Sequence, residues 1–299
     1  MSAYVPLMLR TGWVLERYYG WKLLEEQPAL KLLRKSRGPL RTFLLLTRGA
    51  ADEAVAALAE RHAALGPLAI LAWNDFTPDG DAPRRTLLGR SLRRVDGPRW
   101  FGVGTFVFDL REALDAQWAR MASRERTKCR KAEAEGVKLA FSEEADDGLD
   151  AFLTLYRSLA RDKGLEQPRR ALLERMFAEG SLLLTRCLDS AGRTLVANLT
   201  YLQDGDGYFL HGARAAEIPA GAGQLAHWET VRRLKANGSS FYDLGLVARR
   251  DDADGIYRFK KALGGSFVDF GLEYQRVPAG LQAAYRAFRG LRARLRTAG

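Results

Sequence analysis

An aromatic residue followed directly by a lysine, Phe259-Lys260, lies near the middle of residues 242–267. The pattern there predicts a short buried strand, a charged loop, a short helix, a glycine pair and another strand. A lysine held at such a helix places a positive charge where an oxyanion forms during acyl transfer. The alternative is an exposed lysine on a helix surface. Lys260 is therefore the first candidate for a catalytic group.

The remaining residues that often do chemistry are scattered. The histidines His62, His211 and His227 do not suggest a nucleophilic triad, and each is expected to pack or form hydrogen bonds rather than catalyse. The cysteines Cys129 and Cys187 lack the spacing of zinc ligands. The sequence contains neither a Walker loop nor a GxGxxG motif. We therefore expect no metal or bound cofactor, and a reducing, cytoplasmic setting.

The charge balance indicates an anionic partner. The net charge is +11 with a pI of about 9.8, which favours RNA, nucleotide phosphates or an acidic membrane surface. Within the predicted helix 111–135, one row of cations repeats at steps of four, four and three: Arg120, Arg124, Lys128 and Lys131. The alternative is an ordinary solvated helix face.

The length of 299 residues suits two domains of about 120–150 residues each. No apolar run of about 18 residues predicts a membrane span, and the start of the chain does not resemble a signal peptide. In the first half, strand 42–47, helix 51–65 and strand 68–73 predict a βαβ-like unit. Strand 101–110 follows, and Asp109 at its end is expected to cap the long helix 111–135.

The second half has a characteristic element order. The pattern predicts helices 148–163 and 168–178, strands 182–188, 194–202 and 208–213, helix 221–237, strand 241–246, helix 256–263 and strand 266–270. This order resembles that of the N-acetyltransferase-like (GNAT) fold, in which an acyl donor lies between the splayed fourth and fifth strands. The expected fold class is therefore α/β.

The GNAT resemblance can be tested at one loop. Acetyl-CoA enzymes of that fold carry Gln/Arg-x-x-Gly-x-Gly/Ala before the helix whose N-terminus holds the pyrophosphate. Here Gly221 and Gly223 are present, but Ile218 stands where Gln or Arg is expected. Acetyl-CoA or another acyl-CoA is therefore a weaker expectation than the fold itself.

A larger set of motifs resembles the FemABX peptidyltransferase family. The matching segments follow in the order of that family: Gly104–Leu110, Arg124–Val137, Ala197–Tyr201, His211–Arg214, Leu225–Glu229, Gly238–Gly245 and Gly255–Gly265. Together they span most of residues 101–270, whereas the first hundred residues match more weakly. The chain departs from the family at Gly245-Leu246, where a double glycine is usual.

The resemblance implies tandem GNAT-like domains without the coiled-coil arm of some members. It implies transfer of an amino acid from aminoacyl-tRNA to an amine of a peptidoglycan precursor, either a UDP-linked muropeptide or lipid II. The Phe-Lys pair of the family falls on Phe259 and Lys260. Lys260 would then stabilise the tetrahedral oxyanion and hold the tRNA terminus.

These inferences define an expected site and expected domains. Catalysis is assigned to Lys260, Phe259 and Asp243, the last as a candidate general base beside substrate-assisted proton transfer. Substrate binding is assigned to Tyr242, Arg258, Tyr257, Arg214, His211, Arg124 and Lys128. The expected domains are a degenerate GNAT-like domain at 1–118, a catalytic GNAT-like domain at 119–278 and a basic amphipathic helix at 279–299.

Two alternatives remain for the function. One is an acyl-CoA-dependent N-acyltransferase of the same fold. The other is a non-catalytic protein that binds RNA or a membrane. A monomer is favoured, and peripheral contact with an anionic membrane is an alternative to a purely cytoplasmic location.

Overall fold

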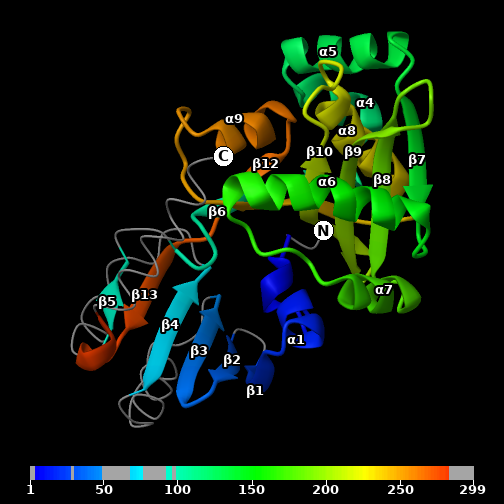
Figure 1. Cartoon of the computed structure of the whole chain (residues 1–299). Coiled ribbons are helices and arrows are strands. Elements are labelled where there is room, and N and C mark those ends of the chain that lie inside the picture. Colours follow the sequence, from blue (N-terminus) through cyan, green and yellow to red (C-terminus); the bar gives the residue numbers. More distant parts are fainter. Residues whose placement is uncertain (1–3, 28–29, 49–67, 77–91, 96–98, 283–299) are drawn as a thin grey trace. The chain divides into compact units, whose positions relative to one another are not determined.

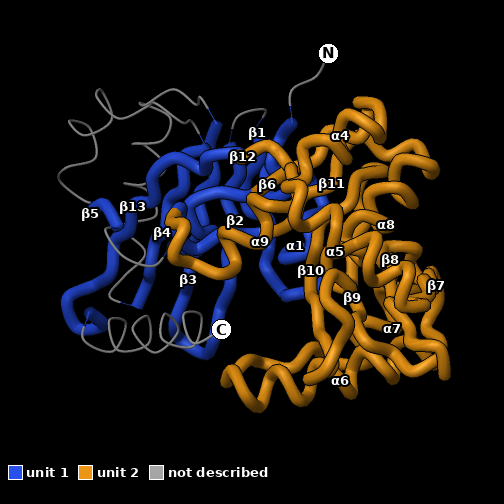
Figure 2. Tube along the Cα trace, turned by 90° about the horizontal axis from the view of Figure 1, so that it is seen from above, with its two compact units in different colours: residues 1–105, 246–250, 268–297 blue, residues 106–245, 251–267, 298–299 orange. Residues whose placement is uncertain are grey.

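A computed structural model of the chain describes residues 4–27, 30–48, 68–76, 92–95 and 99–282. The chain divides into two compact units, coloured separately in Figure 2. Unit 1 comprises Met1–Thr105, Leu246–Arg250 and Val268–Thr297, and unit 2 comprises Phe106–Gly245, Asp251–Phe267 and Ala298–Gly299. The expected helix 51–65 and nearly all of the expected helix 279–299 lie outside the described residues.

Unit 1 contains a six-stranded sheet in the order β1-β2-β3-β4-β13-β5. Its elements are η1 (Leu7–Leu9), α1 (Val14–Tyr18), β1 (Lys22–Gln27), β2 (Leu30–Arg37), β3 (Leu40–Thr47), β4 (Ala69–Asp75), β5 (Arg93–Arg94), β13 (Leu272–Arg276) and η2 (Ala279–Leu281). Strands β1 to β3 are antiparallel, and β4 pairs with β3 in parallel. The expected strands 42–47 and 68–73 are thus confirmed as neighbours in one sheet.

Unit 2 is built on a seven-stranded sheet in the order β12-β6-β11-β10-β9-β8-β7 (Figure 1). Its strands are β6 (Gly104–Asp109), β7 (Lys138–Ser142), β8 (Leu182–Leu188), β9 (Thr194–Gln203), β10 (Asp206–Arg214), β11 (Phe241–Val247) and β12 (Ser266–Asp269). Its helices are α4 (Leu114–Arg120), α5 (Ser123–Ala134), α6 (Asp147–Lys163), α7 (Arg170–Ala178), α8 (Ala222–Ala236) and α9 (Gly255–Ala262). Every element expected between residues 148 and 270 is present.

Helices α6 and α8 cover opposite faces of this sheet. Tyr156 of α6 contacts His211 of β10, whereas Thr230 of α8 bonds to Thr185 of β8 at 2.9 Å. In the sheet register, His211 is level with Leu199 and Thr185 with Asn198. Adjacent residues of a strand point to opposite faces, so the two helices lie on different sides.

The two sheets have four strands in a common arrangement, β1 to β4 in one and β8 to β11 in the other. In each, three consecutive antiparallel strands are followed by a fourth that pairs in parallel with the third. The longest helix of the described residues is α6, with 17 residues, and no coiled-coil arm occurs among them. The α/β class and the tandem GNAT-like arrangement expected from the sequence are thereby confirmed.

The prediction of a single helix over residues 111–135 is wrong, because Met121 and Ala122 have non-helical backbone angles and separate α4 from α5. The backbone of Gly264 approaches this joint so closely that a Cβ there would lie 2.6 Å from the Met121 nitrogen. Arg126 donates to the carbonyl oxygens of Ala119, at 2.7 Å, and Met121, at 2.5 Å. The basic row is thus split, with Arg120 on α4 and the other three cations on α5.

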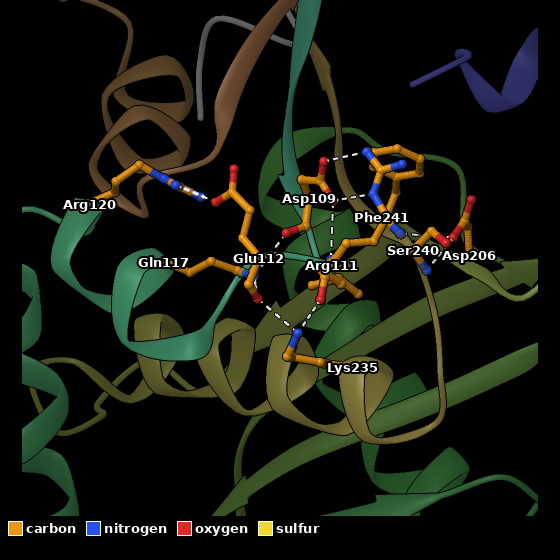
Figure 3. A network of polar contacts seen from close by, with 10 residues as sticks. Asp109, Arg111, Glu112, Gln117, Arg120, Asp206, Lys235, Ser240 and Phe241 are labelled. Carbon is orange, nitrogen blue, oxygen red and sulfur yellow. Dashed lines mark hydrogen bonds and ion pairs between the residues drawn. The ribbon is translucent and has the colours of Figure 1, made fainter. Parts of the chain in front are cut away.

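Asp109 also has a different role from the expected helix cap. Its Oδ1 accepts from the Arg111 side chain at 2.7 Å, and no side chain caps α4. Figure 3 shows the network around this pair. Lys235 donates to the carbonyl oxygens of Leu110 and Glu112, and Asp206 accepts the Phe241 N–H at 2.8 Å. The network fixes the end of β6 beside the start of β11.

The unit boundary lies between residues 105 and 106 rather than at 118/119. Strand β6 hydrogen-bonds within the seven-stranded sheet, which places the sequence just before α4 in unit 2. At the other end, β13 pairs with β4 and β5 and so belongs to unit 1. The sequence therefore places β13 in the wrong domain, because its partners lie about 200 residues earlier.

Candidate active site

The neighbouring strands β10 and β11 are in register only at Gly207 with Tyr242 and at Tyr208 with Asp243 among the described residues. Beyond this point β10 has an irregular register between Phe209 and His211. The parallel strands thus separate after a short pairing, as the GNAT fold requires. The candidate site is assembled at this separation.

Lys260 reaches the separation from α9. This helix begins after Asp254, whose carboxylate accepts the Tyr257 N–H at 2.8 Å. Tyr257 and Lys260 lie three residues apart on its buried face, whereas Arg258 is exposed. The Lys260 side chain donates from Nζ to the Gly245 carbonyl oxygen at 2.9 Å. Only 7% of this lysine is exposed, so it is not an ordinary surface lysine.

The charge of Lys260 is only partly stabilised by its surroundings. Burial lowers its pKa to about 8, while the nearby carboxylates of Asp243 and Asp254 oppose that fall. The ammonium form therefore still predominates at neutral pH. A desolvated ammonium of this kind interacts strongly with a developing oxyanion.

Asp243 orders the turn that faces Lys260. Its side chain is fully buried, and Oδ1 accepts the Gly245 N–H at 2.7 Å. Gly245 has a φ of +77°, and a Cβ at this position would lie 2.8 Å from the Phe209 carbonyl oxygen. A glycine is therefore required for the carbonyl of residue 245 to point at Lys260.

Aromatic rings surround this cluster. The buried Tyr242 hydroxyl lies 3.0 Å from Nδ1 of His227, on α8. The His227 ring lies 4.8 Å from that of Phe209 and 5.6 Å from that of the half-buried Phe259. The structure thus brings Lys260, Phe259, Asp243 and Tyr242 together.

His227 was not expected at the site. Burial lowers its pKa to about 3, with a further contribution from the charge of Lys260, and burial raises the pKa of Tyr242. Both groups are therefore neutral at physiological pH. The only sequence signal was the position of His227 on the apolar face of a helix, which is equally typical of a packing residue.

The other expected binding residues are more dispersed. Tyr257 packs in the interior, with its ring 5.5 Å from that of Phe106. Arg214 is exposed at the end of β10, and Arg258 is exposed on α9. His211 packs edge-on against Tyr156 on the α6 face, and burial lowers its pKa to about 4.

Arg124 and Lys128 bind a carboxylate of their own helix. The buried Glu125 lies 3.0 Å from the Arg124 Nε and 3.0 Å from the Lys128 Nζ, and it accepts from Gln224 Nε2 at 2.7 Å. Burial acts to raise the pKa of Glu125, but the hydrogen bonds from Lys128, Arg124 and Gln224 outweigh it and lower the pKa. Arg124 and Lys128, both expected to bind substrate, are thus paired with Glu125, which also bonds to Gln224 in the first turn of α8.

The loop before α8 does not have the features of a pyrophosphate site. Gly221 has a φ of +98°, and a Cβ there would lie 2.2 Å from the Lys128 carbonyl oxygen. This glycine therefore allows α5 to pack against the helix start. The carboxylate of Glu125, bonded to Gln224 of the first turn, repels a second anion. The residues present do not fit the diphosphate of an acyl-CoA.

Two kinds of feature are absent from the described residues. They contain no group of three or more His, Cys, Asp or Glu side chains arranged to hold a metal ion. None of the helices they form is long and apolar enough to cross a membrane.

Comparisons with known proteins support this description. Residues 117–261 match the family model described as "Acetyltransferase (GNAT) domain". The model supports the acyltransferase class expected from the sequence. No curated protein matches the chain.

Several solved structures have a similar fold. The crystal structure of FemX superposes with a TM-score of 0.62 at 16% identity, covering 90% of this chain and 90% of FemX. L-PGS from Bacillus licheniformis has a TM-score of 0.57 at 12% identity, covering 95% of each chain. A tandem GNAT protein from the clavulanic acid biosynthesis pathway has a TM-score of 0.50 at 15% identity, covering 87% of this chain and 85% of that one. At these identities, the likeness concerns the fold. Residues 117–261 thus match the acetyltransferase (GNAT) domain model, and the chain has a tandem GNAT-like fold that is similar to the structure of FemX.

Proposed function

We propose that this protein is an aminoacyltransferase that moves an amino acid from aminoacyl-tRNA to an amine of a peptidoglycan precursor, either a UDP-muropeptide or lipid II. The observation that carries the proposal is the buried Lys260 at the separation of β10 and β11. The similarity to FemX and the net charge of +11 support it. Aminoacyl-tRNA is a cytoplasmic donor, so the reaction takes place in the cytoplasm, either in solution or at the inner face of the membrane.

The proposed reaction is an ester aminolysis. The acceptor amine attacks the aminoacyl ester carbonyl, so that a C–N bond forms and the C–O bond to the tRNA ribose breaks. The ammonium of Lys260 stabilises the negative charge on the carbonyl oxygen in the tetrahedral intermediate. The proton lost by the amine is taken up by the departing ribose oxygen. The Phe209 ring, whose centroid lies 6.0 Å from the Lys260 Nζ, contributes to the aromatic surroundings of this charge, and Phe259 and Tyr242 pack around the His227 ring.

Asp243 is less suited to act as the general base than the sequence suggests. Its Oδ1 already accepts the Gly245 N–H, and its side chain is fully buried. A base must be within hydrogen-bond reach of the proton that it removes. Substrate-assisted transfer to the ribose oxygen is therefore the mechanism that we prefer.

An acyl-CoA-dependent N-acyltransferase is the second candidate, because the family model at residues 117–261 describes acetyltransferases. The packing of Gly221 against Lys128 and the position of Glu125 argue against a CoA diphosphate at α8. The likeness to L-PGS and to the C-terminal domain of a putative lysylphosphatidylglycerol synthetase from Agrobacterium fabrum makes a lipid acceptor a further arm of the test.

The test supplies the protein with tRNA charged with labelled amino acids and, separately, with acetyl-CoA. Each donor is combined with a UDP-muropeptide, lipid II or phosphatidylglycerol vesicles, and products are identified by mass spectrometry. We expect transfer from aminoacyl-tRNA to a precursor amine, and a loss of roughly 10²–10³-fold in rate in Lys260→Met. Incorporation from acetyl-CoA alone contradicts the proposal. Binding of RNA or vesicles without turnover favours the non-catalytic alternative.

A further inference from the structure

We propose that His227 is a second oxyanion donor, which acts through its Nε2–H beside the ammonium of Lys260. The inference rests on the acyl transfer proposed above, because the donor acts on the tetrahedral intermediate of that reaction. It adds a catalytic group that sequence reasoning assigned to packing.

The position of His227 carries the inference. Its ring lies 4.8 Å from the Phe209 ring, and the Lys260 Nζ lies 6.0 Å from the centroid of the same ring. His227 comes from α8 and Lys260 from α9, so two helices each bring a nitrogen-bearing side chain near the ring of one residue of β10. The ring of Phe259, which precedes Lys260, lies 5.6 Å from that of His227.

One ring nitrogen of His227 is held and the other remains available. The Nδ1 atom lies 3.0 Å from the Tyr242 hydroxyl, whereas Nε2 forms no hydrogen bond with any part of the chain that the structure describes. A catalytic imidazole needs this arrangement, in which one nitrogen is oriented by a partner while the other faces the reacting group.

The useful tautomer is the one in which the Tyr242 hydroxyl donates to Nδ1. The buried Tyr242 keeps its phenolic proton, because burial raises its pKa. When this hydroxyl donates to Nδ1, the imidazole hydrogen resides on Nε2. His227 then offers an N–H to an oxygen that acquires negative charge.

A neutral imidazole suits this role better than a charged one. The charge that acts on His227 is the ammonium of Lys260 on α9, and the carboxylate of Asp243 on β11 acts on its partner Tyr242. Burial and the Lys260 charge together hold the pKa of His227 near 3, so it stays neutral and does not compete with the lysine for the oxyanion. A base with such a low pKa would be a poor proton acceptor, and so the donor role is favoured.

The test combines NMR on the protein without substrate and kinetics with the aminoacyl donor. Nitrogen-15 spectra of histidine-labelled protein report which ring nitrogen carries the hydrogen, with His227→Phe identifying the signal. We expect the Nε2–H tautomer in the parent, and a mixture of tautomers in Tyr242→Phe. The Nδ1–H tautomer in the parent overturns the proposal whether or not the protein transfers amino acids, so this arm is independent of the proposed function.

The kinetic arm measures kcat and KM. We expect kcat to fall about 10²-fold in His227→Phe with little change in KM, and to fall by less in Tyr242→Phe. Tyr274→Phe, which removes the hydroxyl of a buried tyrosine of unit 1, is the matched control and keeps the parental rate. A kcat in His227→Phe within threefold of the parent overturns the proposal. If His227→Phe does not fold, the proposal is tested by the kcat of Tyr242→Phe and by the tautomer of His227 in the parent.

Discussion

The side-chain ammonium of Lys260 donates a hydrogen bond of 2.9 Å to the carbonyl oxygen of Gly245, joining α9 to the end of β11. The Gly245 N–H is in turn held by Asp243 at 2.7 Å. The backbone N–H and carbonyl of Gly245 therefore connect the buried carboxylate of Asp243 to the buried ammonium of Lys260.

The proposed reaction should lose rate at alkaline pH as Lys260 deprotonates. Burial lowers the pKa of Lys260 to about 8, so its charge, and with it the oxyanion stabilisation, is lost as the pH rises through that value. We expect kcat to fall above pH 8 in the parent. In Lys260→Arg the alkaline fall should vanish, since a guanidinium stays charged. A parental profile that is flat from pH 7 to 10 contradicts the proposed role.

Replacement of Gly245 by alanine should reduce both stability and activity. The added Cβ would lie 2.8 Å from the Phe209 carbonyl oxygen, and the φ of +77° disfavours any side chain. We expect a loss of about 1–3 kcal/mol in the free energy of unfolding, measured by urea denaturation, together with a lower kcat.

The control for Gly245→Ala is Gly192→Ala in the turn between β8 and β9. Gly192 has a similar φ of +83°, but a Cβ there meets nothing within 4 Å. It should lose about 1 kcal/mol from the backbone conformation alone, with unchanged kcat. Equal effects of the two substitutions would show that close packing at Gly245 is unimportant.

The two functions of Asp243, its hydrogen bond and its charge, can be separated. In Asp243→Asn the amide oxygen still accepts the Gly245 N–H, but the negative charge that raises the pKa of Lys260 is removed. The pKa of Lys260 should therefore fall below 8, and the alkaline fall in kcat should move to lower pH. Asp243→Ala loses the hydrogen bond as well, so its kcat should be lower than that of Asp243→Asn at every pH. Identical profiles for the parent and Asp243→Asn would contradict this interpretation.

Glu125 should stabilise the fold at neutral pH and less so in acid. Its pKa is lowered in the native state, so its contribution is present above the ordinary value and is lost as the pH falls through the native one. Glu125→Gln removes the charge that binds Arg124 and Lys128, and should cost about 1–3 kcal/mol at pH 7.

Denaturation of the Glu125→Gln variant and of the parent at pH 7 and at a series of acidic pH values provides the measurement. The difference between them should shrink as the pH falls through the lowered native pKa of Glu125, because the parental carboxylate then becomes protonated. Glu133→Gln, at an exposed position of the same helix α5, is the matched control and should change stability by less than about 0.5 kcal/mol. A difference that stays constant with pH would exclude the ion pairs as its cause.

The sequence predicts regular elements well where local signals agree. Helix α6 has apolar residues on one face, begins after Asp146, whose carboxylate accepts the Gly148 N–H, and ends at Gly164 in the left-handed conformation. Each of these signals lies within a few residues of the feature that it defines. The second-half strands and helices were predicted for the same reason.

The errors arise where a distant contact or a competing local partner overrides the expected pattern. The joint between α4 and α5 depends on the approach of Gly264, which lies more than 140 residues later. Asp109 has the composition and place of a cap, but the neighbouring Arg111 binds its carboxylate instead. At the site, the sequence identifies Lys260 and Asp243. The contact between His227 and Tyr242 depends on how α8 packs on the sheet, and the sequence does not show it.

Strand β13 has a consequence for how the protein is made. It lies between β4 and β5, with Glu273 level with Asn74, so the sheet of unit 1 needs a strand from near the end of the chain. During synthesis the first hundred residues leave the ribosome with one side of β4 unpaired, while most of unit 2 emerges and is able to fold. The N-terminal part of the protein therefore completes its folding last. Until then its exposed strand edge is a site for aggregation or chaperone binding.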